Sequence, residues 1–216
     1  MTPLRTSVRD KRKLLFVSIA VGLTPIVAGL LVLYTQVDRS LAQSATKATI
    51  MGLHKTEAVM DRVSAAAGKI RYLAGQPCDA ALSTLRMGVV SETYLRSLTL
   101  VRNNRMYCSS LEGVMSAPLD PANFHDGKFW LRQGNPTTPD SSMLYYRLYS
   151  DPQGIAAIVD GQTLLDALDI RGDETPLILE MGAAWLDRLG NVRTEDIPEN
   201  PEHHVKQTSR RYGYCA

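Results

Sequence analysis

The sequence predicts an α+β protein in which an N-terminal transmembrane helix continues into a long helix packed on a mainly antiparallel sheet. Three observations predict this class: an uncharged apolar run near the N-terminus, helical spacing of the apolar residues that follow it, and later short alternating segments separated by turn residues. A chain of 216 residues holds one such domain beside an anchor. The formal net charge of +2 gives no indication of a nucleic-acid partner.

The first element is a membrane anchor. Residues 14–34 carry no charge, and twenty-one helical residues at about 1.5 Å each span the roughly 30 Å of a bilayer's hydrocarbon core. Basic residues concentrate in 1–13, which predicts a cytoplasmic tail there and an extracytoplasmic domain over 35–216. A cleaved signal peptide is the alternative, but its apolar core is usually about 7–15 residues long, and no clean Ala-x-Ala site follows directly.

The second element is a long helix over residues 36–76. The segment has no proline, and its apolar residues recur at steps of four, three, four and three: Val59, Val63, Ala66, Ile70 and Leu73. Such a stripe packs either on the domain itself or on a second copy of the chain, so the pattern is also compatible with a homodimer formed through this helix. Gly75 and Pro77 predict the end of the helix.

Shorter elements follow in order. Residues 79–90 and 161–170 have the spacing of short helices. Alternation around Asn103-Asn104, which tolerate a positive φ, predicts a hairpin of 98–101 and 106–110. With this hairpin, 143–149 and 155–160 are expected to form an antiparallel meander. Further strands are expected at 176–180, 183–189 and 208–214, whereas 112–142, with four prolines, and 194–204 are expected to be irregular.

Two of the three cysteines lie beside these elements. Cys78 follows the predicted end of the long helix, and Cys108 lies in the return strand of the hairpin. A bridge between them would close a loop of about thirty residues and add roughly 3–4 kcal/mol to stability in the chain-entropy model. The alternative is two buried thiols acting as small apolar side chains. Neither belongs to a Cys-x-x-Cys motif, so a bridge would be structural or part of a sensor.

Cys108 also opens the tripeptide Cys108-Ser109-Ser110. An anchor with a basic flank, a long helix ending just before a cysteine and, about thirty residues later, a hairpin with Cys-Ser-Ser together resemble the CSS-motif domain. The resemblance runs from residue 14 to Tyr212-Gly213-Tyr214, which resembles the family's final periplasmic strand. In that family the domain is the periplasmic sensor of bacterial cyclic-di-GMP phosphodiesterases; it lies between two membrane helices and precedes a cytoplasmic EAL catalytic domain.

The resemblance implies a location and a function. Cys78 and Cys108 would be a redox pair, whose oxidation favours the inactive enzyme and whose reduction releases activity or marks the protein for proteolysis. The chain would be a single-pass protein of the bacterial inner membrane with its domain in the periplasm. Its expected partner there is the thiol-oxidising system of that compartment.

The chain departs from the family pattern beyond this domain. No second apolar span follows residue 35, and no Glu-Ala-Leu tripeptide occurs, Glu57-Ala58-Val59 being the nearest string. We therefore expect a truncated member or a fragment, a regulatory part that is not itself an enzyme. No cofactor is expected. Cys215 is expected to be a leftover, inert thiol.

Two further sets of residues are candidates for a metal site and for a ligand pocket. The histidines lack the spacing of metal ligands, so no metal site is expected: His54, His125, His203 and His204. Aromatic and basic side chains could line a small-ligand pocket of a PAS- or Cache-like sheet, although aromatic residues on strands are usually core: Trp130, Tyr145, Tyr146 and Arg147. The alternatives to a redox sensor are therefore a ligand-binding ectodomain with a purely structural bridge and an anchored scaffold for envelope proteins.

Overall fold

The computed structural model describes residues 8–134, 141–148, 152–168, 178–186, 191–195, 205–213 and 215. The chain divides by its internal contacts into two parts, residues 1–44 and 45–216. Some predicted features lie outside the described residues: the strand ends at 149, 176–177 and 187–189, the helix end at 169–170, the pair His203-His204, and Tyr214.

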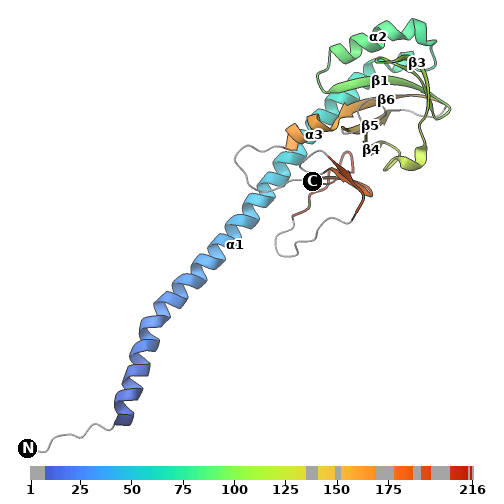
Figure 1. The fold of residues 1–216 in the computed structure, drawn as a ribbon. Helices are drawn as coiled ribbons and strands as arrows, with labels where there is room; N and C mark the ends of the chain where they lie inside the picture. Colours follow the sequence, from blue (N-terminus) through green and yellow to red (C-terminus); the bar gives the residue numbers. More distant parts are fainter. Residues whose placement is uncertain are drawn as a thin grey trace, which may run out of the picture. The chain divides into compact units, whose positions relative to one another are not determined.

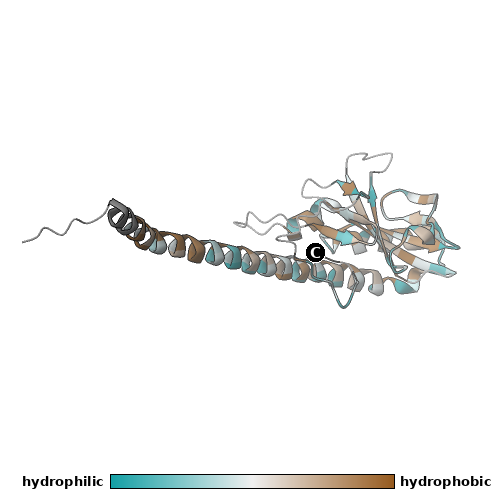
Figure 2. Cartoon of the chain, turned by 90° about the horizontal axis from the view of Figure 1, so that it is seen from below, coloured by the Kyte–Doolittle hydropathy of each residue, from teal (hydrophilic) through white to brown (hydrophobic). Residues whose placement is uncertain are grey.

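Helix α1 (Val8–Lys69) begins in the first part of the chain. Its large apolar side chains between residues 16 and 34 are exposed, and Figure 2 shows this stretch in brown, the colour of hydrophobic residues. Pro25 lies within the helix, and the neighbouring Thr24 hydroxyl donates to the carbonyl of Ala20 at 2.8 Å. Among the described residues, this is one helix long and apolar enough to cross a membrane.

In the second part, α1 supplies one wall of the core. Four members of the predicted stripe are at most 5% exposed, and Ala67, rather than Ala66, completes the buried face: Val59, Val63, Ala67, Ile70 and Leu73. The helix ends at Lys69, several residues before Gly75 and Pro77. A 3-10 turn, η1 (Arg71–Leu73), follows, and Gly75 then takes a φ of 85°, a left-handed conformation that favours glycine.

The core sheet has six antiparallel strands in the order β3-β2-β1-β6-β5-β4 (Figure 1). The strands are β1 (Leu95–Arg102), β2 (Arg105–Ser109), β3 (Gly113–Pro118), β4 (Phe129–Gln133), β5 (Ser142–Leu148) and β6 (Gln153–Asp160). The predicted hairpin is β1-β2, turned by Asn103 and Asn104 at φ 48° and 56°. A continuous meander was the wrong expectation, because two three-stranded meanders are joined where β1 pairs with β6.

Strands β3 and β4 lie in the region expected to be irregular. They form the two edges of the sheet, where Pro118 can end β3 without removing a central hydrogen bond. Between them, the 3-10 turn η2 (Pro121–Asn123) begins at Asp120, whose carboxylate accepts from the Ala122 N–H at 2.9 Å. Pro118 thus lies at a strand end and Pro121 in a turn, and neither excludes strands from this region.

Helices cover one face of the sheet. Side chains from α1, α2 (Cys78–Val90) and α3 (Gly161–Leu168) share one core with the inward residues of the strands, among them Leu98 and Leu100. The opposite face carries a smaller cluster around Val101 and Phe124. This arrangement confirms the predicted α+β class, with a long N-terminal helix and a mainly antiparallel sheet.

A second sheet of three short strands, β7 (Leu179–Met181), β8 (Ala184–Leu186) and β9 (Val192–Arg193), lies near β4. The expectation of a strand at 208–214 is wrong over the described residues. Thr208 makes an isolated bridge with Cys215, whereas residues 210–212 form a turn. Alternating apolar residues are absent from this stretch, so it had only weak strand character.

Candidate functional site

The strongest candidate site is the disulfide between Cys78 and Cys108, whose Cα atoms are 5.3 Å apart. Cys78 is the first residue of α2, directly after Pro77. Cys108 lies in β2, opposite Leu100 of β1 and Val114 of β3. The bond therefore ties the start of a helix to an inner strand of the sheet.

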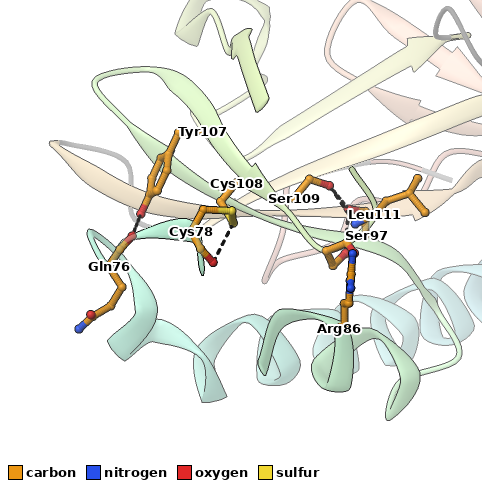
Figure 3. The surroundings of a disulfide bond; sticks show 9 residues. Gln76, Cys78, Arg86, Ser97, Tyr107, Cys108, Ser109 and Leu111 are labelled. Atoms are coloured by element: carbon orange, nitrogen blue, oxygen red, sulfur yellow. Dashed lines mark hydrogen bonds between the residues drawn. A yellow bond between two sulfur atoms is a disulfide. The ribbon is translucent and has the colours of Figure 1, made fainter. Parts of the chain in front are cut away.

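The two sulfur-bearing residues differ in exposure. Cys108 is 0% exposed, whereas Cys78 retains 9%. Sγ of Cys108 lies 3.8 Å from the carbonyl oxygen of Cys78, the dashed contact in Figure 3. A disulfide sulfur carries no hydrogen, so this is a contact and not a hydrogen bond in the oxidised protein. After reduction, the Cys108 thiol would have a proton to donate to that oxygen.

Two further interactions hold the segment that leads into Cys78, and we call them the carbonyl clamp. Arg102 Nη2 donates to the Gly75 carbonyl at 2.7 Å, and Tyr107 Oη donates to the Gln76 carbonyl at 2.9 Å, as Figure 3 shows for Tyr107. The Arg102 guanidinium lies over the Tyr107 ring, 4.7 Å from its centroid. Gly75 also packs so closely on Gln153 that a Cβ would meet its Oε1 at 2.2 Å.

The two serines of the tripeptide form a buried hydroxyl cluster with Ser97 of β1. Ser97 Oγ lies 3.1 Å from both Ser109 Oγ and Ser110 Oγ, and all three residues are at most 7% exposed. Ser110 Oγ accepts from the Leu98 N–H at 3.1 Å, and Ser109 Oγ accepts from the Leu111 N–H at 3.2 Å. These bonds satisfy the buried N–H of Leu98 and the partly buried N–H of Leu111 near the end of β2.

Helix α2 reaches the same cluster. Arg86 Nε donates to the Ser110 carbonyl at 3.1 Å, on the side of the hairpin that Figure 3 shows facing α2. The tripeptide is thus attached to α2 at both ends, by the disulfide at Cys108 and by this hydrogen bond at Ser110. Sequence reasoning missed four residues of this site: Ser97, Arg102, Tyr107 and Arg86. They come together only because β1 pairs with β2 and α2 packs against this hairpin.

The C-terminal segment contacts α1 at a separate place. Ser209 Oγ donates to Glu57 Oε1 at 2.6 Å, and Arg211 Nη1 lies 2.7 and 2.6 Å from the two oxygens of Asp61. The Tyr212 hydroxyl donates to the same Asp61 carboxylate. These bonds, first that from Tyr212 and then that from Arg211, lower the pKa of Asp61, whereas burial, followed by the bond to Asp61, raises the pKa of Tyr212.

The aromatic residues proposed as one pocket lie on both faces of the sheet. Tyr146 belongs to the helix-covered core, where its hydroxyl lies 3.2 Å from Ser64 Oγ. Trp130 and Tyr145 pack together on the opposite face, with ring centroids 5.1 Å apart, and Arg147 is buried there with its guanidinium over Phe124. Adjacent strand residues point to opposite faces, so these four side chains cannot line a single pocket.

The other predicted positions remain separate from the disulfide. Cys215 is a free, partly buried cysteine whose Sγ lies 3.2 Å from Thr208 Oγ1, and its backbone pairs with Glu180. His54 lies 3.9 Å from Glu57, and His125 lies 3.5 Å from Asp126. Within the part of the chain that the structure describes, no group of three or more His, Cys, Asp or Glu side chains could hold a metal ion.

Comparison with known proteins identifies the family of this domain. A family model described as the CSS motif domain associated with EAL matches residues 41–216. A search of curated proteins found no match. The family match covers the disulfide, the hydroxyl cluster and the whole sheet, well over half of the chain. The chain therefore belongs to the CSS-motif family, the domain associated with EAL proteins.

Proposed function

We propose that this chain is the redox-sensing regulatory module of a cyclic-di-GMP phosphodiesterase, with the Cys78–Cys108 disulfide as its switch. One observation carries the proposal: the bond joins the first residue of α2, which follows α1 and the turn η1, to a buried residue of β2. A change at this bond would act on the segment that connects α1 to α2. Membership of a family associated with EAL supports a phosphodiesterase as the regulated enzyme.

The switch operates by thiol-disulfide exchange. A thiolate of a small or protein reductant attacks Sγ of Cys78, the more exposed partner, and Cys108 leaves as a thiolate that takes up a proton. A second thiolate then attacks the mixed disulfide, which frees Cys78 and leaves the reductant as its own disulfide. Two electrons pass to the protein. Oxidation reverses these steps through a thiol-oxidising partner.

The membrane arrangement is part of the same proposal. Residues 1–13 form a cytoplasmic tail, residues 14–34 cross the inner membrane, and residues 35–216 lie in the periplasm. The basic flank of the apolar run supports this orientation, and the absence of exposed charge from 16 to 34 supports the span. Disulfides form and persist in that compartment. Contact between two copies along α1 would pass the signal as a homodimer.

Thiol trapping in cells tests the switch. Cells are quenched with acid, and the full chain carrying Cys215→Ser is alkylated with a mass-shifting maleimide, in a normal strain and in one that lacks its periplasmic thiol oxidase. The proposal expects both remaining cysteines to be blocked in the normal strain and free in the oxidase mutant. Free thiols in the normal strain would refute the disulfide in the cell.

The same experiment separates the switch from a structural bond. A pair that stays blocked in both strains, even when reductant is added to the growth medium, would favour a ligand-binding domain with a permanent bridge. That alternative also expects a thermal shift with a small metabolite that is unaffected by reductant. An anchored scaffold would instead co-purify with a partner and respond to neither treatment.

A further inference from the structure

The carbonyl clamp spans the same gap as the disulfide. Gln76 comes two residues before Cys78, and Tyr107 directly precedes Cys108, so the two hydrogen bonds of the clamp and the S–S bond all join the segment 75–78 to β1 and β2. Both clamp acceptors are backbone carbonyls. Both donors are side chains of the sheet, and neither is part of the buried core, because Arg102 is exposed and Tyr107 is only partly buried.

We propose that Arg102 and Tyr107 are positioning residues that set the redox equilibrium of the Cys78–Cys108 pair. The inference rests on the proposed function, in which this pair is reduced and oxidised. After reduction, the two thiols can separate only if the segment 75–78 moves away from the hairpin. The clamp opposes this movement and so keeps the effective concentration of one thiol at the other high.

The size of the effect follows from the populations involved. The oxidised protein always has the segment docked, because the S–S bond holds it there. The reduced protein has it docked in one fraction and released in another. Weakening the clamp raises the free energy of the docked arrangement in both redox states but leaves that of the released, reduced protein unchanged. The oxidation constant therefore falls, and it falls more when a larger fraction of the reduced protein is released. One hydrogen bond shifts such an equilibrium by about two- to tenfold.

The two clamp residues contribute in different ways. The Arg102 guanidinium brings a positive charge to the Gly75 carbonyl and also rests on the Tyr107 ring, so it orients the second donor. The Tyr107 hydroxyl supplies only a neutral hydrogen bond. Tyr107→Phe keeps the ring under Arg102 and removes one bond, whereas Arg102→Gln removes the charge and the ring contact together. The arginine variant is therefore expected to shift the equilibrium more.

The test is a redox titration of the full chain with Cys215→Ser, purified in detergent. Protein is equilibrated with defined ratios of reduced to oxidised glutathione, which balances as one protein disulfide plus two glutathione thiols giving two protein thiols plus one glutathione disulfide. The thiols are then trapped and counted. Tyr107→Phe and Arg102→Gln should lower the oxidation constant by about two- to tenfold; a fivefold decrease corresponds to about 20 mV.

Arg105→Gln is the matched control. Arg105 pairs with Arg102 across the hairpin, but its Nη2 donates to Ser116 Oγ of β3 at 3.0 Å and not to a carbonyl of segment 75–78, so this variant should titrate close to the parent. Arg102→Lys, which keeps the charge, should restore part of the loss. Titration curves of Tyr107→Phe and Arg102→Gln that coincide with that of the parent, at whatever melting temperature, would overturn the proposal. A cysteine pair that never changes redox state in cells would instead overturn the proposed function. The two failures can be distinguished, because the titration of the purified protein does not depend on what happens in cells.

Discussion

Removal of the disulfide should lower the stability of the domain by an amount that its loop length sets. We consider Cys78→Ser and Cys108→Ser in a chain that also carries Cys215→Ser. The bond joins residues 30 apart in sequence. In the chain-entropy model, a loop of this length is worth about 3.6 kcal/mol at 25 °C. For a domain of this size, the loss corresponds to a decrease of about 7–14 °C in melting temperature.

The two variants should not be equal. Cys108 is fully buried among apolar side chains, whereas Cys78 lies at the edge of the core. A serine hydroxyl at 108 must be desolvated, and the Cys78 carbonyl oxygen that the present sulfur contacts is 3.8 Å away from it. Burial without a good hydrogen bond costs about 1–3 kcal/mol. Cys108→Ser should therefore be the less stable variant by about that amount.

Denaturant unfolding of the parent and both variants, each with and without reductant, measures these differences. The parent should lose about 3–4 kcal/mol on reduction, and both variants should be insensitive to reductant. Equal unfolding midpoints for the oxidised and reduced parent would refute the reasoning, because the bond would then not constrain the unfolded chain. Equal midpoints for the two variants would refute only the argument from burial.

Three other predictions follow from contacts outside the disulfide. Asp61→Asn should release the C-terminal segment and raise hydrogen exchange over 209–213; since the pKa of Asp61 is lowered, its contribution to stability is complete above about pH 5 and is lost as the pH falls through that lowered pKa, so exchange that Asp61→Asn leaves unchanged at pH 7 would contradict it. Ser110→Ala should destabilise the domain by about 1–3 kcal/mol in denaturant unfolding by leaving a buried β1 N–H without its partner, whereas Ser83→Ala on the exposed face of α2 should not. Gly75→Ala should lower the melting temperature, and adding Gln153→Ala should restore only the part due to the clash, because the φ of 85° remains unfavourable; complete restoration would argue against backbone strain.

The local signals in the sequence predicted the main elements well. The uncharged run, the helical stripe ending near Leu73 and the hairpin at Asn103-Asn104 each depend on residues close in sequence, and the structure has α1, β1 and β2 at these places. The helix α2 was expected from Asp79 and begins one residue earlier, at Cys78. The local patterns placed Cys78 just after the long helix and Cys108 on a strand, and the structure makes Cys78 the first residue of α2.

The edge strands were harder to predict. Strand β3 begins with Gly113 and ends with Pro118, two residue types that are common in loops, and after Gly113 only its alternate residues are partly buried. Its sequence therefore resembled that of a loop. Strand β4 follows a proline-rich turn and is defined by its pairing with β5, for example Trp130 opposite Tyr145. An edge strand has one paired side and less burial, which weakens the pattern that sequence reasoning relies on.

The apolar span, the long helix, the Cys-Ser-Ser hairpin and, through them, the family could be read from the amino-acid sequence. The pairing of β1 with β6, the place of Ser97 in the hydroxyl cluster, and the bonds from Arg102 and Tyr107 to the carbonyls before Cys78 could be seen in the folded protein alone. The physical reason is the range of the interactions. Periodicity and turn chemistry act over a few residues, whereas these contacts join side chains to partners set by strand order and register, which depend on burying one common core.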